Sequence, residues 1–261
     1  MHEKIGLGIV TYKRPDFLKQ VLESIEGCLL DEIVVVNDSE PYNYEIPHHV
    51  IQHTENKGVG ISKNDALRYL QAKKCDHYFL MEDDIIVKDK QVFNEYIKAS
   101  KLTGIQHFNF SQHGVVNKTA HNQPVIRARI EYPKYSLPLF RYCIGAVSYY
   151  SRQCLEKVGL MDERFYNAAE HVDHTYRATL EGMHPPYWWF ADINNSEQFL
   201  SEIIWSISTS TISSNSNHSN VVKDADKIFF EKHNAHPLTI PETSQEELGK
   251  SLKSIYKQFV H

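Results

Sequence analysis

Short apolar runs alternate with helical patterns through the first half of the chain. The runs are compact and rich in β-branched residues, which favours strands over helices. We predict four strands: Ile5–Val10, Ile33–Val36, His49–His53 and Tyr78–Met81. Apolar residues at helical spacing follow Arg14-Pro15 and Gly58. Because strands that alternate with helices form parallel βαβ units, we expect an α/β, Rossmann-like fold with a mixed, mostly parallel sheet between helices.

The second half of the chain is less regular. Helices are predicted over Val92–Ser100, Gln153–Val158, Asp162–Leu180 and Glu246–Phe259. Strands are predicted over Phe108–Phe110, Cys143–Tyr150 and Tyr187–Asp192. Arg127–Leu139 is expected to be rich in loops because it holds two prolines, and Ser206–Asn220 has the Ser- and Asn-rich composition of a mobile loop. We expect one domain over residues 1–220 and a C-terminal helical extension over residues 221–261.

Charge and composition exclude several classes of protein. Lys and Arg number 28 against 33 Asp and Glu, so the net charge is −5, which argues against nucleic acid as a partner. No apolar run approaches the ~20 residues that span a bilayer, and the N-terminal residues lack the features of a signal peptide. The four cysteines are scattered, as in proteins with reduced thiols. We therefore expect a cytoplasmic protein without a transmembrane segment.

Three consecutive carboxylates, Glu82-Asp83-Asp84, follow the predicted strand Tyr78–Met81. Such a run repels itself unless a positive charge lies beside it, and Mg²⁺ or Mn²⁺ prefers oxygen ligands of this kind. A solvated acidic turn is the alternative reading of an isolated run. Its position between two apolar segments, at the edge of the core, favours a metal site.

Polar residues also follow the first two predicted strands. Asp38 can accept the imide N–H of a uracil or cap a turn, while Thr11-Tyr12 is open to binding or packing. Asn56 to Gly60 lead into a helix, whose free N–H groups suit a phosphate, although the two common glycine-rich phosphate motifs are absent. Lys63 can add a charge there or lie on the helix surface. Ligands of open α/β sheets bind beyond the carboxyl ends of strands, so these clusters should converge.

A second group of candidates lies in Glu170-His171-Val172-Asp173. A general base must present a carboxylate or imidazole near an acceptor hydroxyl. The alternative for Asp173 is a surface ion pair with Arg177, four residues further along the same helix. His218 can be a late metal ligand or a solvated histidine.

Taken together, these motifs resemble glycosyltransferase family 2, which has the GT-A fold and uses nucleotide sugars. Six stretches lie in family order over roughly residues 5–192: IVTYKRPDFLKQVLESI, EIVVVNDSE, NKGVGISKNDAL, YFLMEDDIIV, IGAVSYYSRQCLEKVGLMDERF and EHVDHTYRATLEG. The resemblance implies that the donor is held by a set of residues that we take to be Thr11, Tyr12, Arg14, Asp38, Asn56, Gly58, Lys63 and Asp83. It matches Glu82-Asp83-Asp84 to the family's DxD motif, with Asp84 as the direct ligand of Mn²⁺ or Mg²⁺ and Glu82 and His218 as further metal candidates. It also implies that Ile144–Tyr150 lines the junction between donor and acceptor.

One departure from the family pattern concerns the base. The usual Glu-Asp pair is Glu170-His171 here, so the position of the catalytic Asp holds His171. We consider Glu170 first, because a carboxylate matches the family's chemistry, then His171 and then Asp173.

The expected function is metal-dependent transfer of a sugar from a nucleotide donor, UDP-linked, to a glycan or lipid-linked glycan acceptor, with inversion at the anomeric carbon. Analogy with the family suggests cell-surface polysaccharide synthesis, with peripheral contact at the inner face of the membrane. Two alternatives are a sugar-phosphate nucleotidyltransferase and a non-catalytic protein that binds nucleotide sugars or glycans. The first lacks support because Thr11–Pro15 contains no glycine. The second remains open because the base position is altered.

Overall fold

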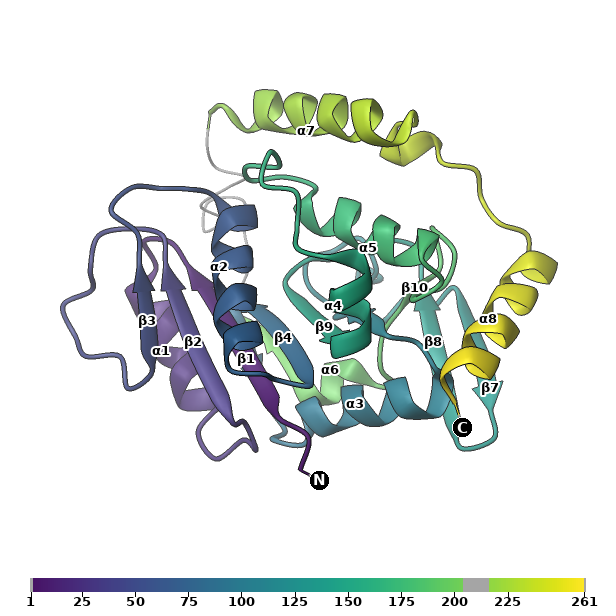
Figure 1. Cartoon of the computed structure of the whole chain (residues 1–261), viewed down its shortest axis with the longest axis horizontal. Coiled ribbons are helices and arrows are strands. Elements are labelled where there is room, and N and C mark those ends of the chain that lie inside the picture. The colour runs from purple at the N-terminus through teal and green to yellow at the C-terminus, as the bar shows by residue number, and fades with distance from the viewer. Residues whose placement is uncertain (1, 204–215, 261) are drawn as a thin grey trace.

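A six-stranded sheet runs through the centre of the molecule (Figure 1), in a computed structural model that describes residues 2–203 and 216–260. Its strands are, in spatial order, β3 (His49–Gln52), β2 (Glu32–Asn37), β1 (Ile5–Thr11), β4 (His77–Glu82), β9 (Val147–Ser151) and β6 (His107–Asn109). The first four are parallel, and β9 is antiparallel to both of its neighbours. The expected mixed, mostly parallel α/β sheet is confirmed.

Helices cover both faces of this sheet (Figure 1). The apolar side chains of β4 alternate between the faces, as they do in any strand. Phe79 packs in a cluster with α1 (Pro15–Ser24), α3 (Val92–Thr103) and α8 (Gln245–Phe259). Leu80 packs in the opposite cluster with α2 (Val59–Ala72), α4 (Arg152–Val158) and α5 (Glu170–Leu180). β1, β2 and β4 are therefore largely buried on both sides, and their carboxyl ends are left to form a site.

Two small sheets complete the second half of the chain. β7 (Ala128–Tyr132) and β8 (Tyr135–Phe140) form a hairpin, to which β10 (Phe190–Ala191) adds a third strand. The expectation that Arg127–Leu139 is rich in loops is therefore wrong. β5 (Ile85–Val87) pairs with β11 (Leu200–Glu202), which follows α6 (Ser196–Phe199). This pairing brings the segment after α6 beside the acidic run that precedes β5.

Three predicted elements are shorter than expected. α5 begins at Glu170 rather than Asp162, because Asp162 accepts hydrogen bonds from the nearby Arg164 and Ala169 has a left-handed φ of 61°. The predicted strand Cys143–Tyr150 is regular only from Val147, and the predicted strand Tyr187–Asp192 only over Phe190–Ala191. A left-handed φ at Ala169 and at Trp188 accounts for the later start of α5 and of β10.

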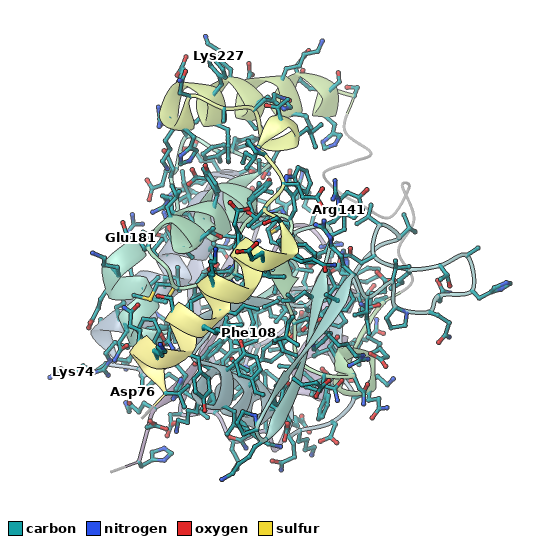
Figure 2. All side chains as sticks on the ribbon, turned by 90° about the vertical axis from the view of Figure 1, so that its right-hand side faces the viewer. Lys74, Asp76, Phe108, Arg141, Glu181 and Lys227 are labelled. Carbon is teal, nitrogen blue, oxygen red and sulfur yellow. The ribbon has the colours of Figure 1, made fainter. Side chains whose placement is uncertain are left out.

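The C-terminal segment wraps around the domain. α7 (His218–His233) lies across the top of Figure 1, a short 3₁₀ turn (Pro237–Thr239) follows, and α8 packs against α3. Figure 2 shows Lys227 on α7 pointing outward and Phe108 behind α8. The expected boundary at residues 220 and 221 falls inside α7. The predicted Ser206–Asn220 loop lies mostly outside the described residues, and its described end enters α7. Within residues 2–203 and 216–260, every helix is too short or too polar to cross a bilayer.

Candidate active site

A cavity of about 360 Å³ opens beyond the carboxyl ends of β1, β2 and β4. It lies where a sheet of this type presents its ligand cleft. Eight residues singled out from the sequence line it: Thr11, Tyr12, Arg14, Asp38, Asn56, Glu82, Asp83 and His218. Tyr166 and Asn167, from the segment before α5, complete one wall. The three polar clusters that follow separate strands therefore converge on one cavity, as expected.

Asp38 holds the loop before α2 against the end of β2. Its Oδ1 lies 2.7 Å from His53 Nδ1 and accepts from Lys57 N at 2.8 Å, and its Oδ2 accepts from Gly58 N at 2.8 Å. A carboxylate has about four acceptor positions, so three are used and one remains for a ligand. The role of Asp38 in binding a uracil stays a prediction.

Three N–H groups that lead into α2 are engaged within the protein. Those of Lys57 and Gly58 bind Asp38, and that of Val59 binds Asn167 Oδ1 at 3.0 Å. Gly58 has a φ of +90°, and a Cβ there would collide with the carbonyl oxygen of Tyr166. This loop therefore shapes the wall of the cavity, and these N–H groups are not free to bind a phosphate in the structure.

The ammonium group of Lys63 is buried in contacts within the protein and is not free to bind a phosphate. Only 1% of its side chain is exposed, and its ammonium group donates to Glu82 Oε1 (2.8 Å), Gly145 O (3.0 Å) and Glu170 Oε1 (3.0 Å). An ammonium has three donors, so all three are used. Burial opposes its charge, yet Glu82 and Glu170 raise the pKa of Lys63 above its ordinary value. Lys63 thus ties β4 to the start of α5.

Arg14 lies over the two aspartates of the acidic run. Its guanidinium group forms ion pairs with Asp83 and, at 3.1 Å, with Asp84 Oδ2. Thr11 Oγ1 donates to Asp83 Oδ2 at 2.6 Å. Burial raises the pKa of Asp83 to about 7. Burial also opposes ionisation of Asp84, but His113 and Arg14 hold its pKa below the ordinary value.

The acidic run fits a divalent cation. Asp84 Oδ1 is buried and has no hydrogen-bond partner within residues 2–203 and 216–260. In the same part of the chain, no three His, Cys, Asp or Glu side chains are grouped as a complete metal site. A hard cation that takes one or two carboxylates completes its shell with water and substrate phosphates, so Asp84 Oδ1 is the oxygen open to such an ion. His218, at the start of α7, also lines the cavity and has a buried Nδ1 without a partner among the described residues.

The residues considered as a base have three different environments. Glu170 is buried, and its Oε1 is bound by Lys63 and lies 3.1 Å from His171 Nδ1. Burial opposes its ionisation, but Lys63 and His171 hold the pKa of Glu170 well below its ordinary value. Asp173 is fully buried and bound by Arg177, Lys232 and His233, which fastens α7 to α5.

His171 is the most exposed of the three and packs against Gly145. A Cβ on Gly145 would collide with the His171 ring, so this close approach requires glycine. The left-handed φ of Ala169 precedes the pair Glu170-His171 directly, and strained backbone of this kind clusters at functional sites. The imidazole of His171 is therefore partly exposed at the start of α5, whereas the carboxylates of Glu170 and Asp173 are buried in ion pairs.

Sequence reasoning missed several residues of this region. His113 Nε2 lies 3.6 Å from Asp84 Oδ1, and Glu202 Oε2 lies 3.7 Å from His113 Nε2. His113 lies in the irregular segment between β6 and β7, and Glu202 is more than 100 residues from Asp84. Neither has a motif or spacing that could have linked it to the acidic run.

Comparison with known proteins gives one relative by sequence. No protein-family model matches the chain. Over 241 residues the chain is 23% identical to a protein of Acanthamoeba polyphaga mimivirus named uncharacterized glycosyltransferase R363, covering 81% of this chain and 86% of the relative.

Several solved structures share the fold. S. aureus TarS matches 99% of this chain with a TM-score of 0.57 and 14% identity, and the chain spans 44% of TarS. The mannosyltransferase PcManGT of Pyrobaculum calidifontis, in complex with GDP-Man and Mn²⁺, matches with a TM-score of 0.55 and 12% identity over 98% of this chain and 70% of its own. Glucosyl-3-phosphoglycerate synthase of Mycobacterium tuberculosis, in complex with Mn²⁺ and UDP, matches with a TM-score of 0.53 and 13% identity over 92% and 82%. The chain therefore has the fold of the GT-A glycosyltransferases, and the resemblance predicted from its sequence motifs is confirmed at that level.

Proposed function

We propose that the chain is a glycosyltransferase that depends on a divalent cation and transfers a sugar from a UDP-linked donor to a hydroxyl group of a carbohydrate acceptor. The observation that carries the proposal is a cavity at the carboxyl edge of the sheet, lined by Thr11, Asp38 and Asp83. Two proteins of the same fold support it, because their structures hold GDP-Man with Mn²⁺ and UDP with Mn²⁺. We extend the proposal to a glycan or lipid-linked glycan acceptor in cell-surface polysaccharide synthesis on the cytoplasmic side of a membrane.

In this proposal the donor lies along the cavity. Asp38 has one acceptor position left for the imide N–H of the uracil. Arg14 also lines the cavity, where it pairs with Asp83. It can donate to the diphosphate, since a guanidinium group pairs well with phosphate oxygens. A cation bound at Asp84 would offset the negative charge of the leaving diphosphate.

We assign His171 as the base and Glu170 as the residue that positions it. With His171 Nδ1 donating to Glu170, the other ring nitrogen, Nε2, is free to accept a proton. The acceptor hydroxyl transfers its proton to Nε2 while its oxygen forms a bond to the anomeric carbon. The bond from that carbon to the phosphate oxygen breaks, and UDP leaves with the electron pair. Direct displacement of this kind inverts the anomeric centre. Glu170 is a poor base itself, because Lys63 stabilises its ionised form.

A nucleotide-release assay tests the proposed function. The purified protein is incubated with a panel of UDP-sugars, glycan acceptors and Mn²⁺, and the released nucleotide is identified. UDP release that requires both acceptor and metal is expected. Release of inorganic diphosphate would indicate a nucleotidyltransferase, and binding without turnover would indicate a non-catalytic protein. A ligand that binds only the folded state stabilises it by about 2.7 kcal/mol at a hundredfold excess over Kd, so a thermal-shift screen identifies the donor first.

The base assignment has its own test. His171→Asn should lower kcat by about 10²–10⁴-fold with UDP binding unchanged. His121→Asn, on an exposed histidine, is the matched control. If the His171 variant keeps near wild-type kcat while Glu170→Gln loses it, the assignment is wrong.

A further inference from the structure

Two buried polar atoms face each other beside the acidic run. Asp84 Oδ1 and His113 Nε2 lie 3.6 Å apart, and neither has a hydrogen-bond partner in the described part of the chain. The exposed fractions of these side chains are only 6% and 15%. At 3.6 Å this ion pair is too long for a hydrogen bond, so each of the two buried atoms lacks one, which is costly.

The chain fold holds these atoms firmly in place. β11 pairs with β5, so Glu202 lies opposite Ile85, and the N–H of Ile203 donates to the carbonyl oxygen of Asp84 at 2.7 Å. Glu202 in turn accepts from the N–H of Gly114 (2.8 Å) and from Lys118 Nζ (2.6 Å). Both donors belong to the segment that carries His113. Glu202 therefore anchors the His113 segment beside Asp84.

The two atoms lie close enough together to bind one ion. Two atoms that each lie about 2.1 Å from a cation are about 3 Å apart at a right angle and about 4 Å apart across it. The observed 3.6 Å lies between these limits. Arg14 takes only Oδ2 of Asp84, so it leaves Oδ1 for an ion.

We propose that Asp84 Oδ1 and His113 Nε2 are the two protein ligands of the divalent cation, that Glu202 positions His113, and that the site prefers Mn²⁺ to Mg²⁺. The preference follows from the imidazole ligand, because Mg²⁺ takes oxygen ligands and dehydrates reluctantly. Water and the diphosphate of the donor complete the shell. This inference deepens the proposed function and rests on it only for the diphosphate ligand.

Titration of the protein with Mn²⁺ alone, followed by electron paramagnetic resonance, tests the proposal without nucleotide or turnover. His113→Ala should weaken Mn²⁺ binding at least 10- to 100-fold, the loss typical of disturbing the groups around a bound metal. Glu202→Gln should weaken it less, and Mg²⁺ should compete poorly with the wild type. His121→Ala, an exposed histidine between the same two strands, is the matched control and should leave the affinity unchanged. Pulsed measurements on the wild type should detect one ¹⁴N coupling to Mn²⁺, absent from the His113 variant.

Each other outcome has a distinct meaning. If His113 only supplies a positive charge to Asp84, its removal leaves Mn²⁺ binding unchanged or makes it tighter, and the proposal is overturned. Loss of the ¹⁴N coupling in His218→Ala instead of His113→Ala also overturns it. If His113→Ala does not fold, as circular dichroism would reveal, the wild-type ¹⁴N coupling decides alone, and its absence refutes the imidazole ligand. Mn²⁺ binding through His113 without any sugar transfer would refute the proposed function and leave this inference standing.

Discussion

Replacement of Lys63 by Met tests whether the ion pairs that join β4 to α5 through Lys63 are as buried as the structure indicates. The ammonium group donates to Glu82, Gly145 and Glu170 at 2.8–3.0 Å. Glu170 is almost fully buried, so its carboxylate would lose its cation without gaining water. Removal of one partner from a buried ion pair costs about 3–5 kcal/mol, and we expect Lys63→Met to lower the free energy of unfolding by that amount at pH 7.

Urea unfolding monitored by tryptophan fluorescence measures this cost. At about 2–4 °C per kcal/mol for a domain near this size, Tm should fall by roughly 6–20 °C. Lys101→Met is the matched control, because its pair with Glu3 is about half exposed and is expected to contribute at most about 1 kcal/mol. The double variant Lys63→Met/Glu170→Gln should recover part of the loss, since it no longer buries an unpaired anion.

The dependence on pH has a definite sign. Lys63 lowers the pKa of Glu170 in the folded protein, so this carboxylate stabilises the wild type above the ordinary glutamate pKa. That contribution is lost as the pH falls toward the lowered value. In Lys63→Met the unpaired carboxylate is destabilising when ionised, so the variant should gain stability between pH 7 and pH 5. A cost below about 1 kcal/mol, or no such gain in acid, would refute the reasoning.

Three further variants test other parts of the site. Asp84→Asn should abolish the Mn²⁺-dependent thermal stabilisation by UDP while the fold is kept, and full turnover in excess chelator would contradict the metal assignment. Asp38→Ala should weaken UDP binding more than GDP binding in calorimetric titrations, because only uracil offers the imide contact; equal losses would indicate that Asp38 only holds Lys57 and Gly58. Gly58→Ala should destabilise the protein by about 1–3 kcal/mol in urea, since its φ is +90° and its Cβ would collide with Tyr166; a neutral effect would mean that this loop can rearrange.

The sequence predicted the parallel half of the fold well, because β1, β2 and β4 are short apolar runs bounded by clear turns. It failed on the β7–β8 hairpin. Pro138 suggested a loop, because proline has no N–H to donate to a neighbouring strand. In β8 the carbonyl oxygen of Pro138 still accepts a hydrogen bond from the N–H of Asp192, and the residue pairs with Arg129 of β7. The helical extension expected from residue 221 begins slightly earlier, at His218, where the composition is loop-like; Phe229 and the contact of Lys232 with Asp173 hold α7 against the domain.

The residues that line the cavity could be predicted because they follow strands that end at the same edge of the sheet. Their individual roles could not. Lys63 was expected to reach a phosphate, and only the packing of α2 against β4 and α5 places its ammonium between Glu82 and Glu170. His113 and Glu202 reach Asp84 through the β5–β11 pairing, which joins segments far apart in the sequence. Contacts of that kind leave no trace in spacing or periodicity.

A crystal structure of the protein with UDP and Mn²⁺ tests the central claim most directly. We predict uracil within hydrogen-bond distance of Asp38, the diphosphate beside Arg14 and Asp83, and Mn²⁺ on Asp84 at the edge of the same cavity. UDP bound at another place on the molecule, or UDP in this cavity with Mn²⁺ away from Asp84, would contradict the account.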